Sequence, residues 1–424
     1  MKGWLIFDKS RSEPKFNRIF IGNSSASAIK EMMKTLILIL LALSGAVLCL
    51  FTAFTVAFRR GRKTAGAGAR QYPFVSLLKP VKNIDDDMAA NLESFYRLDY
   101  PAYEVLFAVD DFKDPCVAIL KDLQARHPHI PTNIVATGYP SLENPKIHKL
   151  ARLESKSRGT LLWATDSNVR VAPDALLRLV DEYVVRDAKV VFSPIRGSLS
   201  RSFGSLMENS SLNFFTSGSV IASWFLGRQA IIVGKSILIE REALETFGGF
   251  GYFKDYLAED FLLGEAFTKS GFLVSTNCTW VTNVSQTATL KSFFKRLSRW
   301  AKLRYHLRRP VYLAEILLNP IVIALAGWAA FGRRGWVVLA LRAAVKVAVE
   351  YANFLFVNRE DSRRLRNHLL FPAAVVVKDL VFFAVYLTPF FSRQLEWRGG
   401  RIAIGRNTLI RIPANVDNLV YDGS

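Results

Sequence analysis

Residues 103–115 read YEVLFAVDDFKDP, in which a strand-like run passes directly into the start of a helix. The first seven residues are mostly apolar and rich in β-branched and aromatic side chains, a composition typical of a buried strand. Asp114 stands before Pro115, which indicates a helix N-cap followed by proline at the first helical position. A strand that leads directly into a helix is the unit from which parallel sheets are built.

The same alternation extends outward over residues 74–193. Apolar, β-rich runs alternate with segments in which apolar residues recur about every 3.6 positions, and Pro145 and Pro173 mark further helix starts. The predicted strands are residues 74–78, 103–109, 133–137, 160–165 and 189–193. This pattern predicts an α/β domain at residues 72–288 with a doubly wound, mostly parallel sheet. Ligands of such sheets bind at the carboxyl ends of the strands.

The composition indicates a membrane protein with a basic surface. The 424 residues are 50% hydrophobic, and 56 Lys and Arg outnumber 36 Asp and Glu to give a net charge of +20. These values exclude a disordered chain or a small disulfide-stapled domain. Cys49, Cys116 and Cys278 match neither a disulfide framework nor a zinc site, which favours a reducing setting. Because the basic charge flanks apolar segments, we expect lipid rather than nucleic acid as the partner.

Residues 35–58 contain no charged side chain and predict a transmembrane anchor. At about 1.5 Å per residue, this run is long enough to cross a hydrocarbon core of about 30 Å. Arg59, Arg60, Arg62 and Lys63 follow, and by the positive-inside rule they hold the next domain in the cytosol. A cleaved signal peptide is the alternative, but its apolar region would be shorter. Residues 1–34 form an N-terminal extension in which Met32 or Met33 is an alternative start.

Residues 289–309 predict a basic helix that lies on the membrane surface. Its apolar residues form one stripe, and lysines and arginines surround it, as in helices that bind anionic lipids. Three further apolar segments follow within residues 310–392, at 311–331, 335–357 and 369–391, and they predict about three more membrane segments. The charged side chains in the last two must pair with each other or face protein. Residues 393–424 form a C-terminal tail.

Acidic residues follow two of the predicted strands, where a ligand would bind. Asp110 and Asp111 come directly after residues 103–109, and with Asp114 they predict contacts to a nucleotide. The alternative is a solvated turn with a helix cap at Asp114. Asp166 ends the strand at 160–165 and predicts a Mg²⁺ or Mn²⁺ ion that carries a diphosphate, because a buried carboxylate needs a cationic partner. A helix cap is again the alternative.

Other candidate residues open helices or line a basic helix. Glu259 and Asp260 open a helix, where the dipole and apolar neighbours can suit Asp260 to general-base catalysis, although acids in a first turn also simply stabilise helices. Lys79, Lys82 and Lys146 lie where a pyrophosphate would be met. Arg296, Arg299 and Trp300, spaced RxxRW, suit phosphate binding and stacking, or a membrane-facing amphipathic helix. Motifs of dinucleotide oxidoreductases, P-loop kinases, zincins and serine hydrolases do not occur in meaningful positions.

Six motifs in order resemble the ceramide glucosyltransferase family, whose members are inverting glycosyltransferases with a GT-A fold. The similarity covers about residues 75–303. The motifs are SLLKPVK (76–82), NLESFYRLDYPAYEVLFAV (91–109), NPKIHKL (144–150), TDSNVRV (165–171), LAEDFLLGEAF (257–267) and RLSRW (296–300). The resemblance implies UDP-glucose as the donor and the hydroxyl of a membrane lipid, ceramide, as the acceptor.

The resemblance also implies roles for the candidate residues. Asp260 would be the catalytic base, and Asp166 would hold the divalent metal and the diphosphate. The donor would be bound by Lys79, Asp110, Asp111, Asp114, Lys146, Arg296, Arg299 and Trp300. Two features depart from the family pattern: Asp166-Ser167-Asn168 replaces a full DxD, and residues 214–224 lack the histidine of animal members. A hopanoid or diacylglycerol acceptor with another UDP-sugar is therefore an alternative.

Three other functions compete with this interpretation. A processive polysaccharide synthase shares the aspartates but normally needs more spanning helices. A non-catalytic lipid-binding scaffold would not need the set of aspartates and arginines. A transporter would leave the α/β domain unexplained. The sequence makes no prediction of the oligomeric state.

Overall fold

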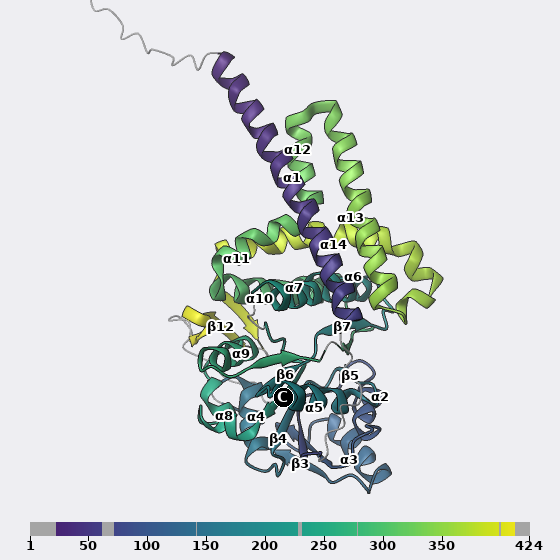
Figure 1. Ribbon diagram of the computed structural model, residues 1–424, viewed down its shortest axis with the longest axis vertical. Coiled ribbons are helices and arrows are strands. Elements are labelled where there is room, and N and C mark those ends of the chain that lie inside the picture. The colour runs from purple at the N-terminus through teal and green to yellow at the C-terminus, as the bar shows by residue number, and fades with distance from the viewer. Residues whose placement is uncertain are drawn as a thin grey trace, which may run out of the picture.

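The computed structural model describes residues 23–61, 72–140, 142–227, 231–277, 279–397 and 400–411. An α/β domain lies at one end of the molecule and a group of long helices at the other, with a layer of transverse helices between them (Figure 1). Arg62, Lys63, Cys278, residues 1–22 of the predicted extension and residues 412–424 of the predicted tail lie outside the described residues.

The α/β domain is built on a seven-stranded, mostly parallel sheet, as predicted. The strand order is β3-β2-β1-β4-β8-β6-β9, and only β8 runs antiparallel to its neighbours β4 and β6. The strands are β1 (Val75–Pro80), β2 (Tyr103–Val109), β3 (Thr132–Ala136), β4 (Leu161–Thr165), β6 (Val190–Phe192), β8 (Ser236–Glu240) and β9 (Val274–Thr276). The five predicted strands are present within two residues of their expected ends, whereas β8 and β9 were not predicted.

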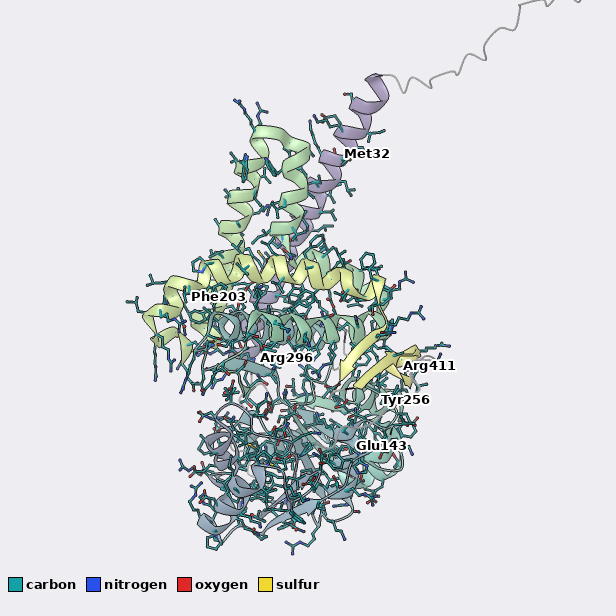
Figure 2. All side chains as sticks on the ribbon, turned by 180° about the vertical axis from the view of Figure 1, so that it is seen from behind. Met32, Glu143, Phe203, Tyr256, Arg296 and Arg411 are labelled. Atoms are coloured by element: carbon teal, nitrogen blue, oxygen red, sulfur yellow. The ribbon has the colours of Figure 1, made fainter. Side chains whose placement is uncertain are left out.

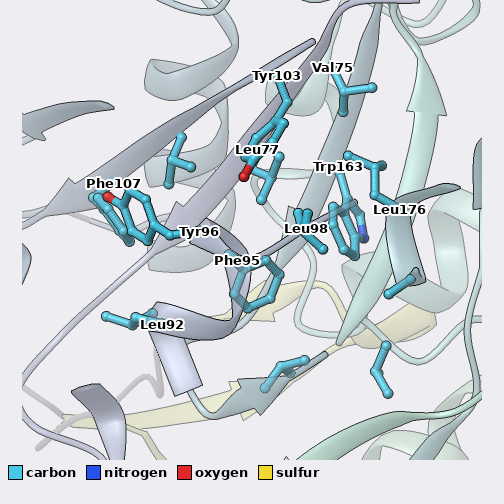
Figure 3. Close-up of a cluster of buried hydrophobic side chains, with 14 of the residues drawn as sticks. Val75, Leu77, Leu92, Phe95, Tyr96, Leu98, Tyr103, Phe107, Trp163 and Leu176 are labelled. Atoms are coloured by element: carbon cyan, nitrogen blue, oxygen red, sulfur yellow. The ribbon is translucent and has the colours of Figure 1, made fainter. Parts of the chain in front are cut away.

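Helices cover both faces of the sheet because each strand points alternate side chains to opposite faces. On β2, Val105 and Phe107 enter one core, and Leu106 enters the other. Figure 3 shows the first core, where Phe95 and Trp163 pack together. The helices over the first core are α2 (Met88–Glu93), α3 (Cys116–Arg126) and α5 (Ala175–Arg186). Those over the second are α4 (Pro145–Glu154), α8 (Arg241–Glu245) and α9 (Glu259–Lys269).

A smaller sheet and several helices connect this domain to the apolar helices. The smaller sheet has the order β5-β10-β7, from β5 (Val169–Arg170), β7 (Ile195–Ser198) and β10 (Val281–Val284). The helices that follow are α6 (Phe203–Ser211), α7 (Ser217–Gly227), α10 (Leu290–Leu307) and α11 (Arg309–Ala314). The basic segment predicted to lie on the membrane surface is α10, and Thr289 caps it by accepting a hydrogen bond from the Ser292 amide at 3.1 Å.

The apolar helices differ in number from the prediction of one N-terminal and about three C-terminal membrane segments. Among the described residues, two helices are long and apolar enough to cross a membrane: α1 (Asn23–Arg60) over Ser27–Arg60, and α14 (Leu365–Phe391). A third exists only if the pair Arg309–Leu318 and Pro320–Trp328, bent by 71°, is one span. The bend is at Asn319, because Pro320 cannot donate a backbone hydrogen bond and starts α12 (Pro320–Phe331) anew.

The predicted segment at 335–357 is α13 (Gly335–Val357), which carries too much charge to count as a span. Its Lys346 and Glu350 are buried and form a four-residue cluster with Lys378 and Asp379 of α14. Lys378 Nζ lies 2.9 Å from Glu350 Oε1 and 2.7 Å from Asp379 Oδ1, and Lys346 Nζ lies 3.0 Å from Glu350 Oε1. These charges pair internally, as required for apolar helices. In Figure 1, α14 runs across the long axis that α1, α12 and α13 follow.

Candidate active site

Predicted site residues form two clusters at the carboxyl ends of β2 and β4. One cluster surrounds Asp110, after β2, and the other surrounds Asp166, after β4. Both contact α4, whose Lys149 reaches Asp110 and whose Lys146 reaches Asp166. Asn144 caps this helix by accepting a hydrogen bond from the Lys146 amide at 3.0 Å, next to Pro145 at its first turn. Asn144 and Pro145 therefore set where α4 begins, and with it the positions of Lys146 and Lys149 on the helix.

Asp110 is buried between two lysines. Its Oδ1 lies 2.7 Å from Lys149 Nζ, and its Oδ2 lies 3.0 Å from Lys82 Nζ. Burial raises the pKa of Asp110, but hydrogen bonds and attraction from Lys149 and Lys82 outweigh burial and hold this pKa below its usual range. Asp110 thus fixes two cations beside the end of β2, and any direct contact between Asp110 and a nucleotide stays a prediction.

Asp111 and Asp114 have different surroundings. Asp111 is partly exposed, and it accepts hydrogen bonds from the Tyr139 hydroxyl and the Lys113 amide, both at 2.6 Å. Asp114 accepts from the Cys116 amide at 2.9 Å and from the Asn83 amide at 3.0 Å, so it caps α3 as the alternative interpretation predicted. Asp111 is therefore the better placed of the two to meet a ligand, and a nucleotide contact at Asp114 stays a prediction.

Asp166 lies between two other lysines. Lys146 Nζ is 3.0 Å from its Oδ1, and Lys235 Nζ is 2.7 Å from its Oδ2. Lys235 also donates to the side-chain oxygen of Asn168 at 2.8 Å. Burial raises the pKa of Asp166, but the charges of Lys146 and Lys235 outweigh burial and hold this pKa well below its usual range. The carboxylate is therefore ionised at neutral pH.

Lys146 and Gly234 connect Asp166 to Asp260, which is far away in the chain. Lys146 donates to the Gly234 carbonyl at 2.7 Å, and the Gly234 amide donates to Asp260 Oδ2 at 2.6 Å. The Phe261 amide donates to the other oxygen of Asp260 at 2.8 Å. A Cβ atom at Gly234 would lie 2.7 Å from Lys146 Nζ and 3.0 Å from Asp260 Oδ2, so only glycine lets these groups approach so closely. The structure thus brings the two predicted carboxylates into one cluster.

Glu259, next to Asp260, belongs to the same cluster. Its Oε1 lies 3.4 Å from Lys146 Nζ, and its Oε2 accepts a hydrogen bond from the Asn144 side chain at 2.9 Å. Burial and the neighbouring charge of Asp260 raise the pKa of Glu259 to about 7, although Lys146 opposes them. Glu259 is therefore the carboxyl group of this cluster that titrates near neutrality.

Replacing Glu259 by glutamine is expected to change how folding stability depends on pH. The folded-state pKa lies above the ordinary value of 4.5, so the folded protein keeps a proton that the unfolded chain releases. This contribution is complete below about pH 4.5 and is lost as pH rises through about 7. Thermal unfolding of E259Q and wild type between pH 5 and 8 should show E259Q gaining relative stability with rising pH, by at most about 3 kcal/mol. A difference that does not change with pH would contradict this assignment.

Lys79 of β1 is buried next to the end of β4. Its side chain is fully buried, and Nζ donates to Thr165 Oγ1 at 2.7 Å and to the Asp166 carbonyl at 3.2 Å. The ammonium also lies 3.4 Å from the centre of the Phe95 ring. Burial holds the pKa of Lys79 well below its usual range. Lys79 therefore supports the end of β4, and a contact of Lys79 with a phosphate stays a prediction.

The RxxRW residues lie on α10, in the helix layer between the two ends of the molecule (Figure 2). Arg296 forms an ion pair with Glu208 of α6, whose side chain is buried. Trp300 packs against the first core of the α/β domain. Arg299 follows Arg296 by almost one helical turn. The motif therefore attaches the basic helix to the α/β domain, and contacts of Arg296, Arg299 and Trp300 with a diphosphate stay predictions.

The residues around Asp166 fit a divalent ion that arrives with a diphosphate. Within the described part of the chain, no three Asp, Glu, His or Cys side chains form a cage for a metal. Mg²⁺ commonly binds one or two carboxylates and completes its shell with phosphate and water oxygens. Asp166 and Asn168 offer such oxygens, and both contact Lys235.

Sequence reasoning missed three residues of this site: Lys149, Gly234 and Lys235. Lys149 follows Lys146 by three residues on the same helix, so helical spacing was a usable signal. Gly234 and Lys235 directly precede β8. Because β8 runs against β4, its amino end lies at the carboxyl edge of β4, and recognising that strand would have placed both residues in the site.

The chain is similar to several known proteins. The chain is 26% identical over 354 residues to ceramide glucosyltransferase 1 of Caenorhabditis elegans, covering 79% of this chain and 74% of that protein. It is 33% identical over 111 residues to the ceramide glucosyltransferase of Komagataella phaffii, covering 25% of this chain and 22% of that protein. Among solved structures, the mannosyltransferase PcManGT from Pyrobaculum calidifontis, in complex with GDP-Man and Mn²⁺, is 18% identical with a TM-score of 0.48. That match covers 82% of this chain and 99% of the mannosyltransferase.

The family model for glycosyl transferase family 21 matches residues 36–410, which include both clusters and all the C-terminal helices. The motifs that resemble ceramide glucosyltransferases are thus matched by a family model over most of the chain. The chain belongs to glycosyl transferase family 21.

Proposed function

We propose that this glycosyltransferase moves glucose from UDP-glucose to the primary hydroxyl of ceramide, with inversion at the anomeric carbon. The observation that carries the proposal is the cluster in which Lys146 and Gly234 join Asp166 to Asp260. A sugar transferase needs a site for a diphosphate leaving group and a base for the acceptor within one sugar's reach. A cationic pair at Asp166 beside a fixed carboxylate at Asp260 supplies both.

Asp260 is the proposed base. Hydrogen bonds from the Gly234 and Phe261 amides hold both oxygens of its carboxylate, so its orientation is set before substrate binds. Asp260 takes the proton of the acceptor hydroxyl as that oxygen attacks the anomeric carbon from the face opposite UDP. The bond from the anomeric carbon to the diphosphate oxygen breaks, and a β-glycoside forms.

Lys146 and Lys235 are the proposed counter-charges of the diphosphate. Each already pairs with Asp166, and negative charge that develops on the leaving UDP is stabilised by cations that are fixed in advance. A divalent ion at Asp166 supplies further Lewis-acid stabilisation when it is bound. At the Asp110 cluster, the exposed face of Tyr139, held by Asp111, suits stacking with the uracil base.

The acceptor proposal rests on the helices that adjoin the α/β domain. We propose that residues 212–233 form the floor over which the lipid acceptor enters, and in their helical part Phe225 of α7 stacks on Phe54 of α1 at 5.2 Å between ring centres. Residues 228–230 of this floor lie outside the described residues. Basic side chains on α10 suit anionic lipid head groups. We propose that the two-chain acceptor stays in the bilayer and that the α/β domain faces the cytosol, since Arg59 and Arg60 end α1 on that side.

Transfer by the purified protein tests the proposal. UDP-glucose, UDP-galactose, UDP-N-acetylglucosamine and UDP-glucuronic acid are each offered with ceramide, diacylglycerol or a hopanoid in vesicles, and mass spectrometry identifies the product. We expect monoglucosylceramide. A different single lipid product would change the donor or acceptor, polymeric sugar would support a polysaccharide synthase, and lipid binding without any turnover of donor would contradict the proposal.

A further inference from the structure

The C-terminal segment returns from α14 to the loop that precedes Asp260. This segment, residues 394–411, is called the C-terminal strap here and contains β11 (Gln394–Trp397), β12 (Gly400–Ile404), a 3-10 turn (Arg406–Thr408) and β13 (Ile410–Arg411). Its strands form a sheet of the order β11-β12-β13. Figure 2 shows Arg411 of the strap beside Tyr256, which lies in the loop ahead of α9. The sequence had assigned no structure to this part of the chain.

Four backbone groups tie the strap to the loop at 255–258. The Leu257 amide donates to the Thr408 carbonyl at 3.1 Å, and the Ile410 amide donates to the Asp255 carbonyl at 2.8 Å. Tyr256 and Leu409 form an isolated antiparallel bridge between these contacts. On its other side the same loop is held by Asn144, whose side chain donates to the Tyr256 carbonyl at 2.8 Å. The loop is therefore clamped between α4 and the strap.

Thr408 makes the contact nearest to the proposed base. Its hydroxyl accepts a hydrogen bond from the Ala258 amide at 3.2 Å, and its side chain is fully buried. Ala258 is the N-cap of α9 and has no side chain that could cap the helix. Glu259 and Asp260 are the next two residues. Thr408 thus fixes the backbone directly before the carboxylate that we assign as the base.

The backbone of Thr408 indicates that its hydroxyl is needed. Its φ is 65°, a left-handed conformation in which a β-branched residue is strained and glycine is not. This conformation lets the carbonyl and the hydroxyl of one residue accept from the consecutive amides of Leu257 and Ala258. A glycine would relieve the strain but would lose the hydroxyl. Threonine at this position is therefore better explained by the contact with Ala258 than by backbone stability.

We propose that Thr408 is a positioning residue that orients Asp260 through the amide of Ala258, so that the strap links α14 to the catalytic loop. The inference rests on the proposed function of Asp260. The strap also contacts the basic helix, because Lys302 of α10 donates to the Gln394 carbonyl at 2.7 Å. One strap therefore connects the RxxRW helix, the last apolar helix and the first turn of α9.

The test separates turnover from stability with two variants that both lack the hydroxyl. T408G relieves backbone strain, whereas T408V keeps the β-branched shape and the strain. Both variants are expected to lower kcat about tenfold, and the affinity for UDP measured by calorimetry should be unchanged. T408G should nevertheless unfold at a higher temperature than T408V. T408S, which keeps the hydroxyl, should restore kcat to within about twofold of wild type. R411A, which changes an exposed side chain of the same strap, is the matched control.

The outcomes distinguish this inference from the proposed function. If kcat follows thermal stability across T408G, T408V and T408S, Thr408 is only structural and the inference is wrong. A kcat for T408G equal to that of wild type also overturns it. If T408G or T408V does not fold, the comparison of kcat between the other of these two variants and T408S decides. D260N is measured in parallel. If D260N retains transfer, Asp260 is not the base and the proposed function is wrong at that point. If D260N loses transfer while T408G and T408V keep the wild-type kcat, only the inference about Thr408 is overturned.

Discussion

D260N is expected to lower the rate of sugar transfer by about 10²–10⁴-fold, the usual contribution of a general base. Asparagine keeps the shape of the side chain but cannot take a proton at neutral pH. Its oxygen can still accept one of the two hydrogen bonds that Asp260 receives from Gly234 and Phe261. Because Lys146 keeps its contact with Asp166, the affinity for UDP should change little. The measurements are product formation at saturating donor and acceptor, and titration calorimetry with UDP.

The matched control for this prediction is D255N. Asp255 is exposed, lies five residues earlier in the same loop and undergoes the same chemical change, so D255N should keep transfer near the wild-type rate. Transfer by D260N near the wild-type rate would show that another group is the base. Glu259 would then be tested first, since burial brings its pKa to about 7. Equal loss of transfer and UDP affinity in D260N would instead show that Asp260 mainly holds the cluster together.

The part of the site that the sequence predicted depends on short-range patterns. An apolar run that ends in an aspartate, as at Val109–Asp110 and Thr165–Asp166, places a carboxylate at the carboxyl edge of a parallel sheet whatever the rest of the chain does. Lys146 follows from the same logic, because Asn144-Pro145 fixes the first turn of α4. These local signals sufficed for β1–β4 and for the positions of Asp110 and Asp166.

The remaining site residues depend on contacts between distant segments. Gly234 and Lys235 belong to no motif. Gly234 reaches Asp260 and Lys235 reaches Asp166 only because β8 inserts antiparallel between β4 and β6. A strand's direction is set by its pairing partners and not by its own five residues. Thr408 is a stronger example: it lies beyond the last apolar helix, and only the folded chain brings it to Ala258.

The burial of Lys79 shows another limit of local patterns. A lysine at the end of a strand is expected to face the ligand, but the side chains of a strand alternate, and this one points beneath the edge onto Phe95. The C-terminal helices show a similar limit. Composition locates the apolar runs correctly and requires their charges to be paired, but it cannot tell that the first run is broken at Pro320.

D166N is expected to lower transfer about 100-fold or more and to abolish any effect of divalent ions on UDP binding. Asp166 contacts both lysines proposed to meet the diphosphate, and its carboxylate is the metal ligand that we propose. An uncharged amide neither fixes the two ammonium groups nor attracts a divalent ion as a carboxylate does. The affinity of wild-type protein for UDP should rise when Mn²⁺ or Mg²⁺ is added and fall in chelator. The affinity of D166N should be the same under both conditions.

D174N is the matched control, because Asp174 pairs with Arg178 at the start of α5. It should behave as wild type in both the metal titration and the transfer assay. If wild-type protein binds UDP and transfers sugar equally well in chelator, the metal proposal is wrong, and Lys146 with Lys235 must neutralise the diphosphate alone. If D166N itself transfers sugar at the normal rate, the donor does not bind at the carboxyl end of β4, and the two clusters on α4 do not form the active site.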